Sequence, residues 1–497
     1  MGITKGRVCN LFAIQCTAIL ATISLSLMSS ASAQPSATLE FKRCSVVVQS
    51  IEIDAECATF KRHENPSDTN SKLLELSVIK LPSHSSEPTP DAFTLIQGGP
   101  GGSSIDLAVT YNHVLDKIRR KRDIIVIDQR GTGRSNLLTC DIDDLSSQLD
   151  LAYTKKLSKE CAEKLSVKND LRFYTTSIAV DDLEALRIAA GYSHFNLYGV
   201  SYGTRVVQHY LRKYPSSARS AVIDGVVQVG LNLAGAEIAR RWEDSFESIN
   251  KRCQNDNDCN SSHGNLRTTY NALQDRFKAE PVKVNLPHPT TGLETDYTFN
   301  ENSLFIAMRL MAYSTEGSAL IPLLLSEALK GNYRFAASQI IILESIFQDQ
   351  FAIGMHNSVM CAEDAPFVTK QDQARAKGTI ATELMSQSLL ATCDAWPQGV
   401  LDDQFHQPFN SDIPTLILSG ETDPITPPAN GEIASNMFSN SKHIVVPAHG
   451  HGVMARGCVP NLVNLFINTA SFEGVDETCT ERENHMPTFN TLTGPRP

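Results

Sequence analysis

Residues 197–204 read LYGVSYGT and place a single serine, Ser201, between two glycines. A short apolar run at residues 195–198 precedes this stretch, and a run with helical spacing follows it at residues 204–213. Glycines allow the sharp strand-to-helix turn that projects a serine hydroxyl from a sheet. The context predicts that Ser201 is a nucleophile, although Gly-x-Ser-x-Gly also occurs by chance in ordinary tight turns.

The sequence on both sides of this stretch repeats the order strand, turn, helix. Short apolar runs typical of buried parallel strands lie at residues 93–96, 123–127, 220–224, 415–419 and 443–447, and residues 176–190 have helical spacing. Residues 45–53 and 73–81 alternate apolar and polar side chains, as half-buried strands do. The chain is therefore predicted to be α/β, with a mostly parallel central sheet and helices on both faces.

The strand-helix order stops between residues 231 and 409. Apolar positions there follow helical spacing at residues 235–251, 303–311, 319–329 and 336–348, without a comparable series of strand-like runs. We expect a helical cap inserted at residues 231–409 between the two parts of the core, residues 34–230 and 410–482. A polar tail, residues 483–497, is expected to be loosely held.

The first residues have the pattern of an export signal. Lys5 and Arg7 precede an apolar run at residues 11–28, and Ala31-Ser32-Ala33 offers small residues where a signal peptidase cleaves. We expect residues 1–33 to be a signal peptide, with an uncleaved membrane anchor as the alternative. The mature chain is then predicted to be secreted or periplasmic and to form no stable association with a membrane.

Cysteine usage agrees with an oxidising compartment. Cys9 and Cys16 fall in the predicted signal, which leaves ten of the twelve cysteines in the mature chain. We expect disulfides rather than a metal site, because no Cys-x-x-Cys pair or histidine cluster is present. Connectivity does not follow from spacing, so pairing of neighbours along the chain is a hypothesis; the ten are Cys44, Cys57, Cys140, Cys161, Cys253, Cys259, Cys361, Cys393, Cys458 and Cys479.

The charge balance excludes some partners. The formal net charge is −11, and it becomes −13 when the signal with Lys5 and Arg7 is removed. An acidic chain without basic runs is not expected to bind nucleic acid or anionic membranes.

A serine nucleophile needs a base and an acid that orients the base, and in this fold the chain order is Ser, then Asp or Glu, then His. Asp423 follows a predicted strand, at the end of the sheet where ligands bind in α/β proteins. Glu421 is the alternative acid. Asp128 also ends a strand but precedes Ser201, and its surroundings, DQRGTGRS at residues 128–135, favour a structured turn.

Two histidines, His449 and His451, follow the next predicted strand, and spacing does not separate them. The oxyanion of an acyl-transfer intermediate needs backbone N–H donors, which are expected from Tyr202 and from Gly99 in the glycine-rich turn QGGPGGS at residues 97–103. A phosphate loop is the alternative for this turn, but Gly-Lys-Ser/Thr is missing. No cofactor and no metal are expected.

With these residues assembled, the chain resembles the α/β-hydrolase peptidases of the prolyl aminopeptidase and tripeptidyl aminopeptidase group. GGPGGS, DQRGTGRS, GVSYGT and the closing pair DPITP with HGHGVMARGC carry the resemblance. It implies that His451, within Gly-His-Gly and upstream of Cys458, is the base, with His449 as the alternative. The prolyl enzymes usually begin the first motif with His, where this chain has Gln97, so a proline-specific activity is less supported than hydrolysis itself.

The resemblance implies a serine aminopeptidase that cleaves peptides from a free N-terminus through an acyl-enzyme on Ser201. Such an enzyme must bind an ammonium group, and Glu363 and Asp364 in the helical cap are the carboxylates we expect to do so; solvated loop acids are the alternative. An esterase or amidase is a second hypothesis, because one fold serves many acyl substrates. A catalytically inactive hydrolase domain used for binding is a third.

Overall fold

The computed structural model describes residues 39–140, 150–234, 236–300, 302–380 and 384–494. The predicted signal peptide, with Cys9 and Cys16, lies outside these residues. Within the described ranges, no helix is long and apolar enough to cross a membrane.

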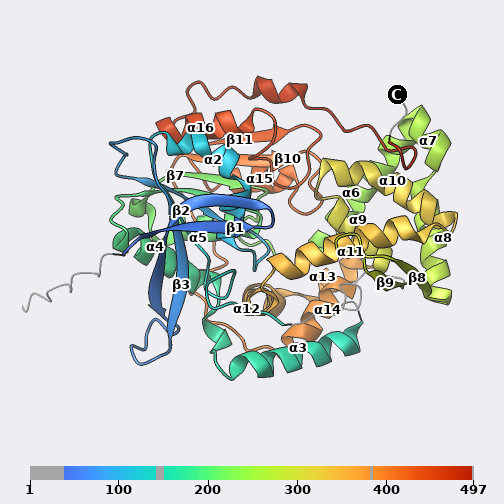
Figure 1. Cartoon of the computed structure of the whole chain (residues 1–497), viewed down its shortest axis with the longest axis horizontal. Helices are drawn as coiled ribbons and strands as arrows, with labels where there is room; N and C mark the ends of the chain where they lie inside the picture. The colour runs from blue at the N-terminus through green and yellow to red at the C-terminus, as the bar shows by residue number, and fades with distance from the viewer. Residues whose placement is uncertain (1–38, 141–149, 235, 301, 381–383, 495–497) are drawn as a thin grey trace, which may run out of the picture. The chain divides into compact units, whose positions relative to one another are not determined.

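A nine-stranded mixed sheet runs through the described core, in the order β1-β2-β3-β5-β4-β6-β7-β10-β11 (Figure 1). The first three strands pair antiparallel with their neighbours, and the pairings from β5 to β11 are parallel. The prediction of a mostly parallel sheet is confirmed. The strands are β1 (Lys42–Val48), β2 (Ile51–His63), β3 (Leu73–Leu81), β4 (Ala92–Ile96), β5 (Ile124–Ile127), β6 (Phe195–Val200), β7 (Ala218–Asp224), β10 (Thr415–Gly420) and β11 (Ser441–Val446).

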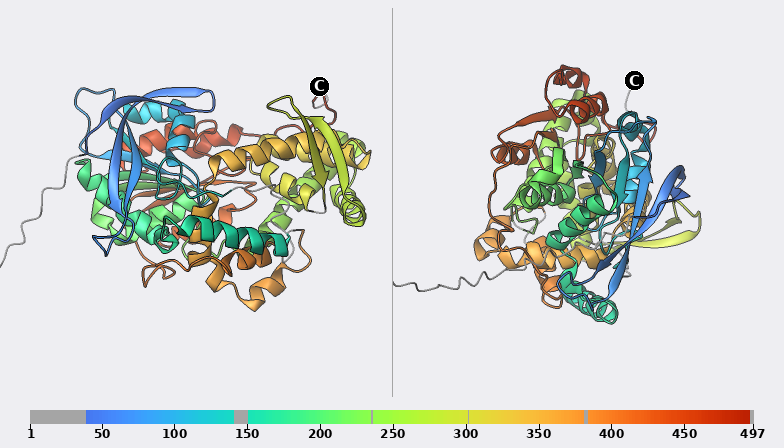
Figure 2. Two further views of the ribbon diagram at one scale, coloured as in Figure 1. Left: turned by 60° about the horizontal axis from the view of Figure 1, so that its bottom comes forward. Right: turned by 90° about the vertical axis from the view of Figure 1, so that its left-hand side faces the viewer.

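Helices cover both faces of this sheet, as expected for strands that are apolar on both sides (Figure 2). Strand β6 shows the division, since Leu197 packs with one apolar cluster and Tyr198 with the other. One cluster includes residues of α4 (Thr176–Ala189), α5 (Tyr202–Lys213) and α15 (Pro428–Ser435). The opposite cluster includes residues of α1 (Ser104–Thr110), α2 (Asn112–Arg119) and α16 (Val459–Thr469).

The single strand predicted at residues 45–53 is wrong. The chain turns back at Gln49 and Ser50, so that β1 and β2 pair as an antiparallel hairpin. Gln49 takes a left-handed conformation with φ of 53°, which a two-residue hairpin turn requires. The valines before the turn and the isoleucines after it keep one continuous β-like pattern, and that pattern conceals the turn.

The inserted segment is mostly helical, as predicted, but it also contains a two-stranded hairpin that the sequence analysis missed. Strands β8 (Val282–Pro287) and β9 (Glu294–Phe299) pair antiparallel. Apolar and polar residues alternate along β8, and Gly292 with φ of 71° follows it, so the signal was present. The helices are α6 (Ala236–Asn255), α7 (Asn257–His263), α8 (Leu266–Ala279), α9 (Ser303–Met311), α10 (Thr315–Leu329), α11 (Tyr333–Gln350), α12 (Ile353–Glu363), α13 (Lys370–Ala376) and α14 (Leu384–Cys393).

The inserted segment has its own apolar cluster, which extends from Ala236 to Ile341 and includes Ala376. Helix α12 packs with the core rather than with the cap, because its Met355 and Val359 lie in an apolar cluster on one face of the sheet. Helix α3 (Leu151–Ser166), from the first part of the core, packs against α14 (Figure 1). The boundary between cap and core is therefore interleaved along the chain.

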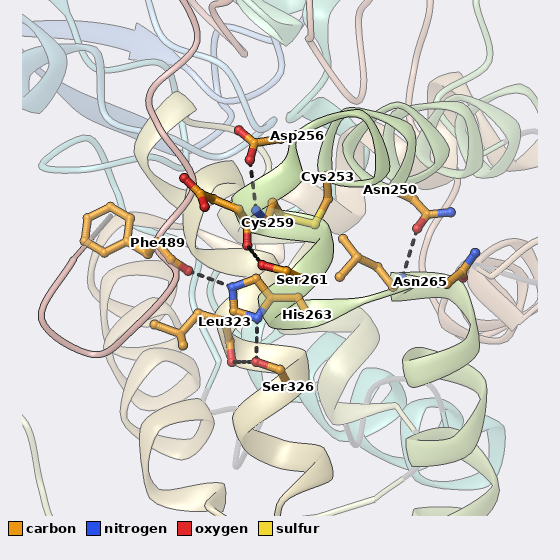
Figure 3. Close-up of a disulfide and its surroundings, with 12 residues drawn as sticks. Asn250, Cys253, Asp256, Cys259, Ser261, His263, Asn265, Leu323, Ser326 and Phe489 are labelled. Atoms are coloured by element: carbon orange, nitrogen blue, oxygen red, sulfur yellow. Dashed lines mark hydrogen bonds between the residues drawn. A yellow bond between two sulfur atoms is a disulfide. The ribbon is translucent and has the colours of Figure 1, made fainter. Parts of the chain in front are cut away.

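Five disulfides join the ten predicted cysteines, each to its neighbour along the chain, in agreement with the sequential hypothesis. The pairs are Cys44–Cys57, Cys140–Cys161, Cys253–Cys259, Cys361–Cys393 and Cys458–Cys479. Cys253–Cys259 links α6 to α7 within the cap (Figure 3).

The expectation of a loosely held tail is wrong for residues 483–489. The Glu483 carboxylate lies 3.0 Å from Nε2 of His449. Further on, the Phe489 N–H donates to the Ala319 carbonyl, and the Phe489 carbonyl accepts from Nε2 of His263, 3.0 Å away (Figure 3). Backbone groups of a polar segment thus find partners in α7 and α10, which hydrophobic patterning does not reveal.

Candidate active site

Ser201 lies at the turn between β6 and α5, with φ of 56° and ψ of −125°. A non-glycine residue is strained in this conformation, and such strain concentrates at functional sites. The Ser201 N–H donates to the Asp224 carbonyl at the end of the adjacent strand β7. The turn is therefore held by the sheet in the shape that exposes a serine hydroxyl.

The two glycines of the motif are required by close backbone contacts. A Cβ on Gly199 would lie 2.4 Å from the Gly203 carbonyl oxygen, and one on Gly203 would lie 2.3 Å from that of Ile96. Side chains at these positions would push α5 away from the sheet and move Ser201.

Asp423 and His451 are brought together as the sequence analysis predicts. His451 Nδ1 lies 2.7 Å from Asp423 Oδ2, although 28 residues separate them. Asp423 follows β10, and its other oxygen accepts the N–H groups of Ile425 and Thr426. The Thr426 hydroxyl donates to Asp423 Oδ2 over 2.7 Å and lies 3.0 Å from His451 Nδ1.

Each member of this pair favours the charged form of the other. Burial alone would lower the pKa of His451, but the charge and hydrogen bond of Asp423 raise it above its ordinary value. Burial alone would raise the pKa of Asp423, but His451 and the N–H groups of Thr426 and Ile425 hold it below its ordinary value. Asp423 is thus suited to stabilise an imidazolium on His451.

The rival residues have other partners. His449 Nε2 faces Glu483, and its Nδ1 lies 3.4 Å from the Thr315 hydroxyl. Glu421 accepts the Ala448 N–H. Asp128 accepts from the Ser103 hydroxyl and from the N–H groups of Ile105 and Arg134, which confirms that it belongs to a structured turn.

A cavity of about 560 Å³ opens beside Ser201 and His451. Gly98 and Gly99 of the glycine-rich turn also line it. The turn passes so near the serine that a Cβ on Gly98 would lie 2.6 Å from Ser201 Cβ. Gln97 supports this turn, because its side-chain oxygen accepts the Gly98 N–H.

The two predicted oxyanion donors belong to segments next to Ser201, and their role stays a prediction. Gly99 lines the cavity, and Tyr202 is the first residue of α5, where helix N–H groups have no intrahelical partner. The Tyr202 ring points elsewhere, since its hydroxyl lies 2.6 Å from that of Thr176 inside the protein.

Glu363 and Asp364 are not placed to bind an ammonium group in this cavity. Both are fully buried, and neither is among its described lining residues. Arg205, from α5, donates to both carboxylates, over 3.1 Å to Glu363 and over 2.8 and 3.0 Å to Asp364. Burial raises the pKa of Glu363 to about 7, despite the opposing charge of Arg205. The expectation that the pair is free for a substrate fails because buried Arg205 already donates hydrogen bonds to both carboxylates; the solvated-loop alternative fails because both are buried.

Three residues near the site were missed. Asp224 ends β7 and accepts the N–H groups of Val453 and Met454, which fixes the loop that carries His451. Burial raises the pKa of Asp224 to about 6. Thr426 lies within the quoted DPITP motif, where its role could have been noticed. The backbone carbonyl of Tyr313 in the cap accepts the backbone N–H of His451, and the Tyr313 ring meets the imidazole edge-on, a long-range contact without sequence signal.

In the part of the chain that the structure describes, no group of three or more His, Cys, Asp or Glu side chains is arranged to hold a metal ion. Ser201 on a strained turn and the His451–Asp423 pair line or border one cavity, and residues of these types can perform covalent acyl transfer.

Comparison with known families agrees with this topology. A model of the alpha/beta hydrolase fold matches residues 91–297, and a model described as TAP-like protein matches residues 379–479. The chain has the α/β-hydrolase fold. Ser201 lies within the residues matched by the alpha/beta hydrolase model, and Asp423 and His451 lie within those matched by the TAP-like model.

The chain matches several known proteins at low sequence identity but over most of its length. Serine protease Hip1 of Mycobacterium tuberculosis is 23% identical over 415 residues, which cover 74% of this chain and 77% of the relative. Putative hydrolase YuaR of Escherichia coli is 23% identical over 420 residues, which cover 80% of this chain and 81% of the relative. Tripeptidyl aminopeptidase of Streptomyces coelicolor is 22% identical, covering 78% and 76%. The chain thus resembles the α/β-hydrolase serine peptidases of the tripeptidyl aminopeptidase group.

Solved structures are similar at a lower level. A serine hydrolase of Cycloclasticus zankles has a TM-score of 0.39 and 14% identity, covering 83% of this chain and 99% of that one. A thermophilic esterase of Thermogutta terrifontis has a TM-score of 0.36 and 14% identity, covering 84% and 98%.

Proposed function

We propose that the protein is an exported serine aminopeptidase that cleaves peptides from a free N-terminus through an acyl-enzyme on Ser201. The observation that carries the catalytic part is the 2.7 Å contact of His451 with buried Asp423, on the rim of the cavity that Ser201 also lines. The names of the relatives support peptides as substrates. Five disulfides and the predicted signal support export.

In the proposed mechanism, His451 Nε2 takes the proton of the Ser201 hydroxyl while its oxygen attacks the substrate carbonyl. Asp423 holds Nδ1–H and stabilises the imidazolium. The oxyanion accepts from the N–H groups of Gly99 and Tyr202. His451 then gives the proton to the leaving amine, and a water activated by the same imidazole hydrolyses the ester on Ser201.

An esterase or amidase activity is the second candidate, and the composition of the cavity favours it. An aminopeptidase needs a carboxylate for the substrate ammonium, but the described residues that line the cavity include no Asp or Glu. Acyl groups without a free amine would need no such partner.

A comparison of three substrate classes separates these candidates. We expect purified protein to cleave unblocked peptide p-nitroanilides and to lose this activity when their N-terminus is acetylated. Equal rates on free and acetylated peptides, or activity on p-nitrophenyl esters alone, would contradict the aminopeptidase proposal and support the alternative.

A further inference from the structure

Arg309 is a charged residue on the mostly apolar cap side of the cavity, which also includes the polar residues His356 and Asn357. It lies on α9 and lines the same cavity as Ser201 and His451. Its neighbours in the lining are largely apolar and include Phe305, Ile306, Leu310, Leu343, Met360 and Leu389. A guanidinium in such surroundings is costly unless a partner matches its charge.

Arg309 has no such partner in the described part of the protein. No hydrogen bond or ion pair joins its guanidinium to a described residue, and its Nε is buried without a hydrogen-bond acceptor. The guanidinium carbon lies 6.0 Å from the centre of the Tyr313 ring. Arg309 is partly exposed, whereas Arg205 and Arg241 are buried and have ion pairs, the first with Glu363 and Asp364 and the second with Glu237.

The described lining of the cavity offers Arg309 no anion. Among its described lining residues, Arg309 carries the single permanent charge, and the other ionisable side chains are His356, Tyr313 and His451. The His356 ring donates toward the Pro100 carbonyl and supplies no negative charge.

The position of Arg309 places its charge near the reacting groups. Tyr313 lies between them, because its ring contacts the His451 ring, 5.1 Å between centroids, and also the guanidinium of Arg309. A molecule bound covalently to Ser201 could therefore extend toward Arg309 within a single cavity of about 560 Å³, a size typical of small-molecule sites.

We propose that Arg309 is a specificity-determining residue that binds a carboxylate of the substrate. A planar guanidinium donates two parallel hydrogen bonds to a carboxylate, a geometry that lysine does not reproduce. The inference rests on the proposed acyl transfer at Ser201, but it does not depend on whether the substrate is a peptide or an ester. The carboxylate could belong to the acyl group or to the end of a short leaving peptide.

Two matched substrate pairs distinguish these sources. For the acyl side, p-nitrophenyl hydrogen glutarate is compared with p-nitrophenyl methyl glutarate, in which the carboxylate is masked. For the leaving side, unblocked tetraalanine is compared with its C-terminal amide. We expect the wild-type protein to prefer the carboxylate member of at least one pair by about 10- to 100-fold in kcat/KM, as a charged hydrogen bond at a partly buried site provides.

Substitution of Arg309 tests the cause of that preference. In Arg309→Met the ratio within the preferred pair should fall to within about twofold, because the aliphatic part remains and the donors are lost. Arg309→Lys should retain part of the ratio. Arg276→Met removes a cap arginine that bonds the Tyr333 hydroxyl outside the cavity, and it should keep the wild-type ratio.

The outcomes separate this inference from the proposed function. If wild-type protein shows no preference in either pair, or if Arg309→Met keeps the preference, the inference is wrong even though Ser201 reacts with a fluorophosphonate. If Ser201→Ala hydrolyses both esters at the wild-type rate, the proposed function fails instead, since the reaction would not pass through Ser201.

Discussion

Two arginines, Arg205 of helix α5 and Arg309 of cap helix α9, differ in how their charge is matched. Arg205, on the nucleophile helix, is buried among carboxylates and makes ion pairs of 2.8 and 3.1 Å with Asp364 and Glu363. Arg309, on cap helix α9, faces the cavity without an ion pair to a described residue. Arg205 thus has its anions within the protein, whereas no described residue supplies an anion to Arg309, and we propose that a ligand does so.

This difference suggests a division of labour. The core side holds the proposed catalytic residues through buried hydrogen bonds, as Thr426 and Asp224 do for Asp423 and the His451 loop. Among the described residues, the cap side of the cavity is mostly apolar and includes Arg309, which has no ion pair to a described residue. Changes in the core should therefore reduce turnover or stability, and changes in the cap should alter which substrate is accepted.

The largest difference in kcat should be between variants of the two neighbouring histidines, His451 and His449. His451→Ala removes the base and should lower kcat by about 10⁵-fold or more. His449→Ala removes a side chain paired with Glu483 away from the cavity, so kcat should stay within about tenfold of the wild type. Steady-state kinetics on the best substrate measures both, and a larger loss in His449→Ala would reverse the assignment of the base.

The next largest difference should be in the free energy of unfolding of variants of Arg205 and Arg309. Arg205→Met leaves two buried carboxylates without their cation and should lower the free energy of unfolding by about 3–5 kcal/mol. Arg309→Met removes an unmatched charge and should change it by less than about 1 kcal/mol. Urea denaturation of both variants tests the comparison, which breaks if Arg309→Met is the more destabilised protein.

The carboxylates beside Arg205 should make stability depend on pH. Burial raises the pKa of Glu363 from an ordinary 4.5 to about 7, so between these values the folded state binds a proton that the unfolded state releases. The free energy of unfolding should therefore fall as the pH rises from about 4.5 to 7.

Glu363→Gln should reduce that fall, because the amide does not titrate. It should not abolish it, since the raised pKa of Asp224 acts in the same direction. Denaturation curves at intervals from pH 5 to 8 measure the slope, and identical slopes in wild type and variant would show that Glu363 does not titrate in this window.

The smallest effect is expected at Thr426. Thr426→Val removes the hydroxyl that donates to Asp423 Oδ2 and should lower kcat/KM by about tenfold. Thr426→Ser keeps the hydroxyl and serves as the matched control. If serine and valine reduce the rate equally, packing rather than the hydrogen bond accounts for the role of Thr426.

The sequence predicted those parts of the site that lie in local motifs. Gly199, Ser201 and Gly203 sit in five consecutive residues whose glycines meet hard steric limits, and Asp423 and His451 follow predicted strands in the required order. The strand-helix order likewise predicted the sheet, because buried parallel strands have short continuous apolar runs.

The sequence did not predict contacts that depend on how distant elements meet. Glu363 and Asp364 were expected at the substrate, but their partner Arg205 lies 158 and 159 residues earlier, and nothing in its local sequence indicates the pairing. The contact of Tyr313 with His451 is of the same kind. The β1-β2 turn and the β8-β9 hairpin were missed for a different reason. Apolar alternation continues through the β1-β2 turn, and predicted helices surround the β8-β9 hairpin.

The most direct test of the central claim is covalent labelling of Ser201. Purified protein is incubated with a fluorophosphonate, its intact mass is measured, and the modified peptide is sequenced. The account predicts one adduct on Ser201 in the wild type and none in Ser201→Ala. Undiminished labelling of Ser201→Ala, or an adduct on another residue of the wild type, would contradict it.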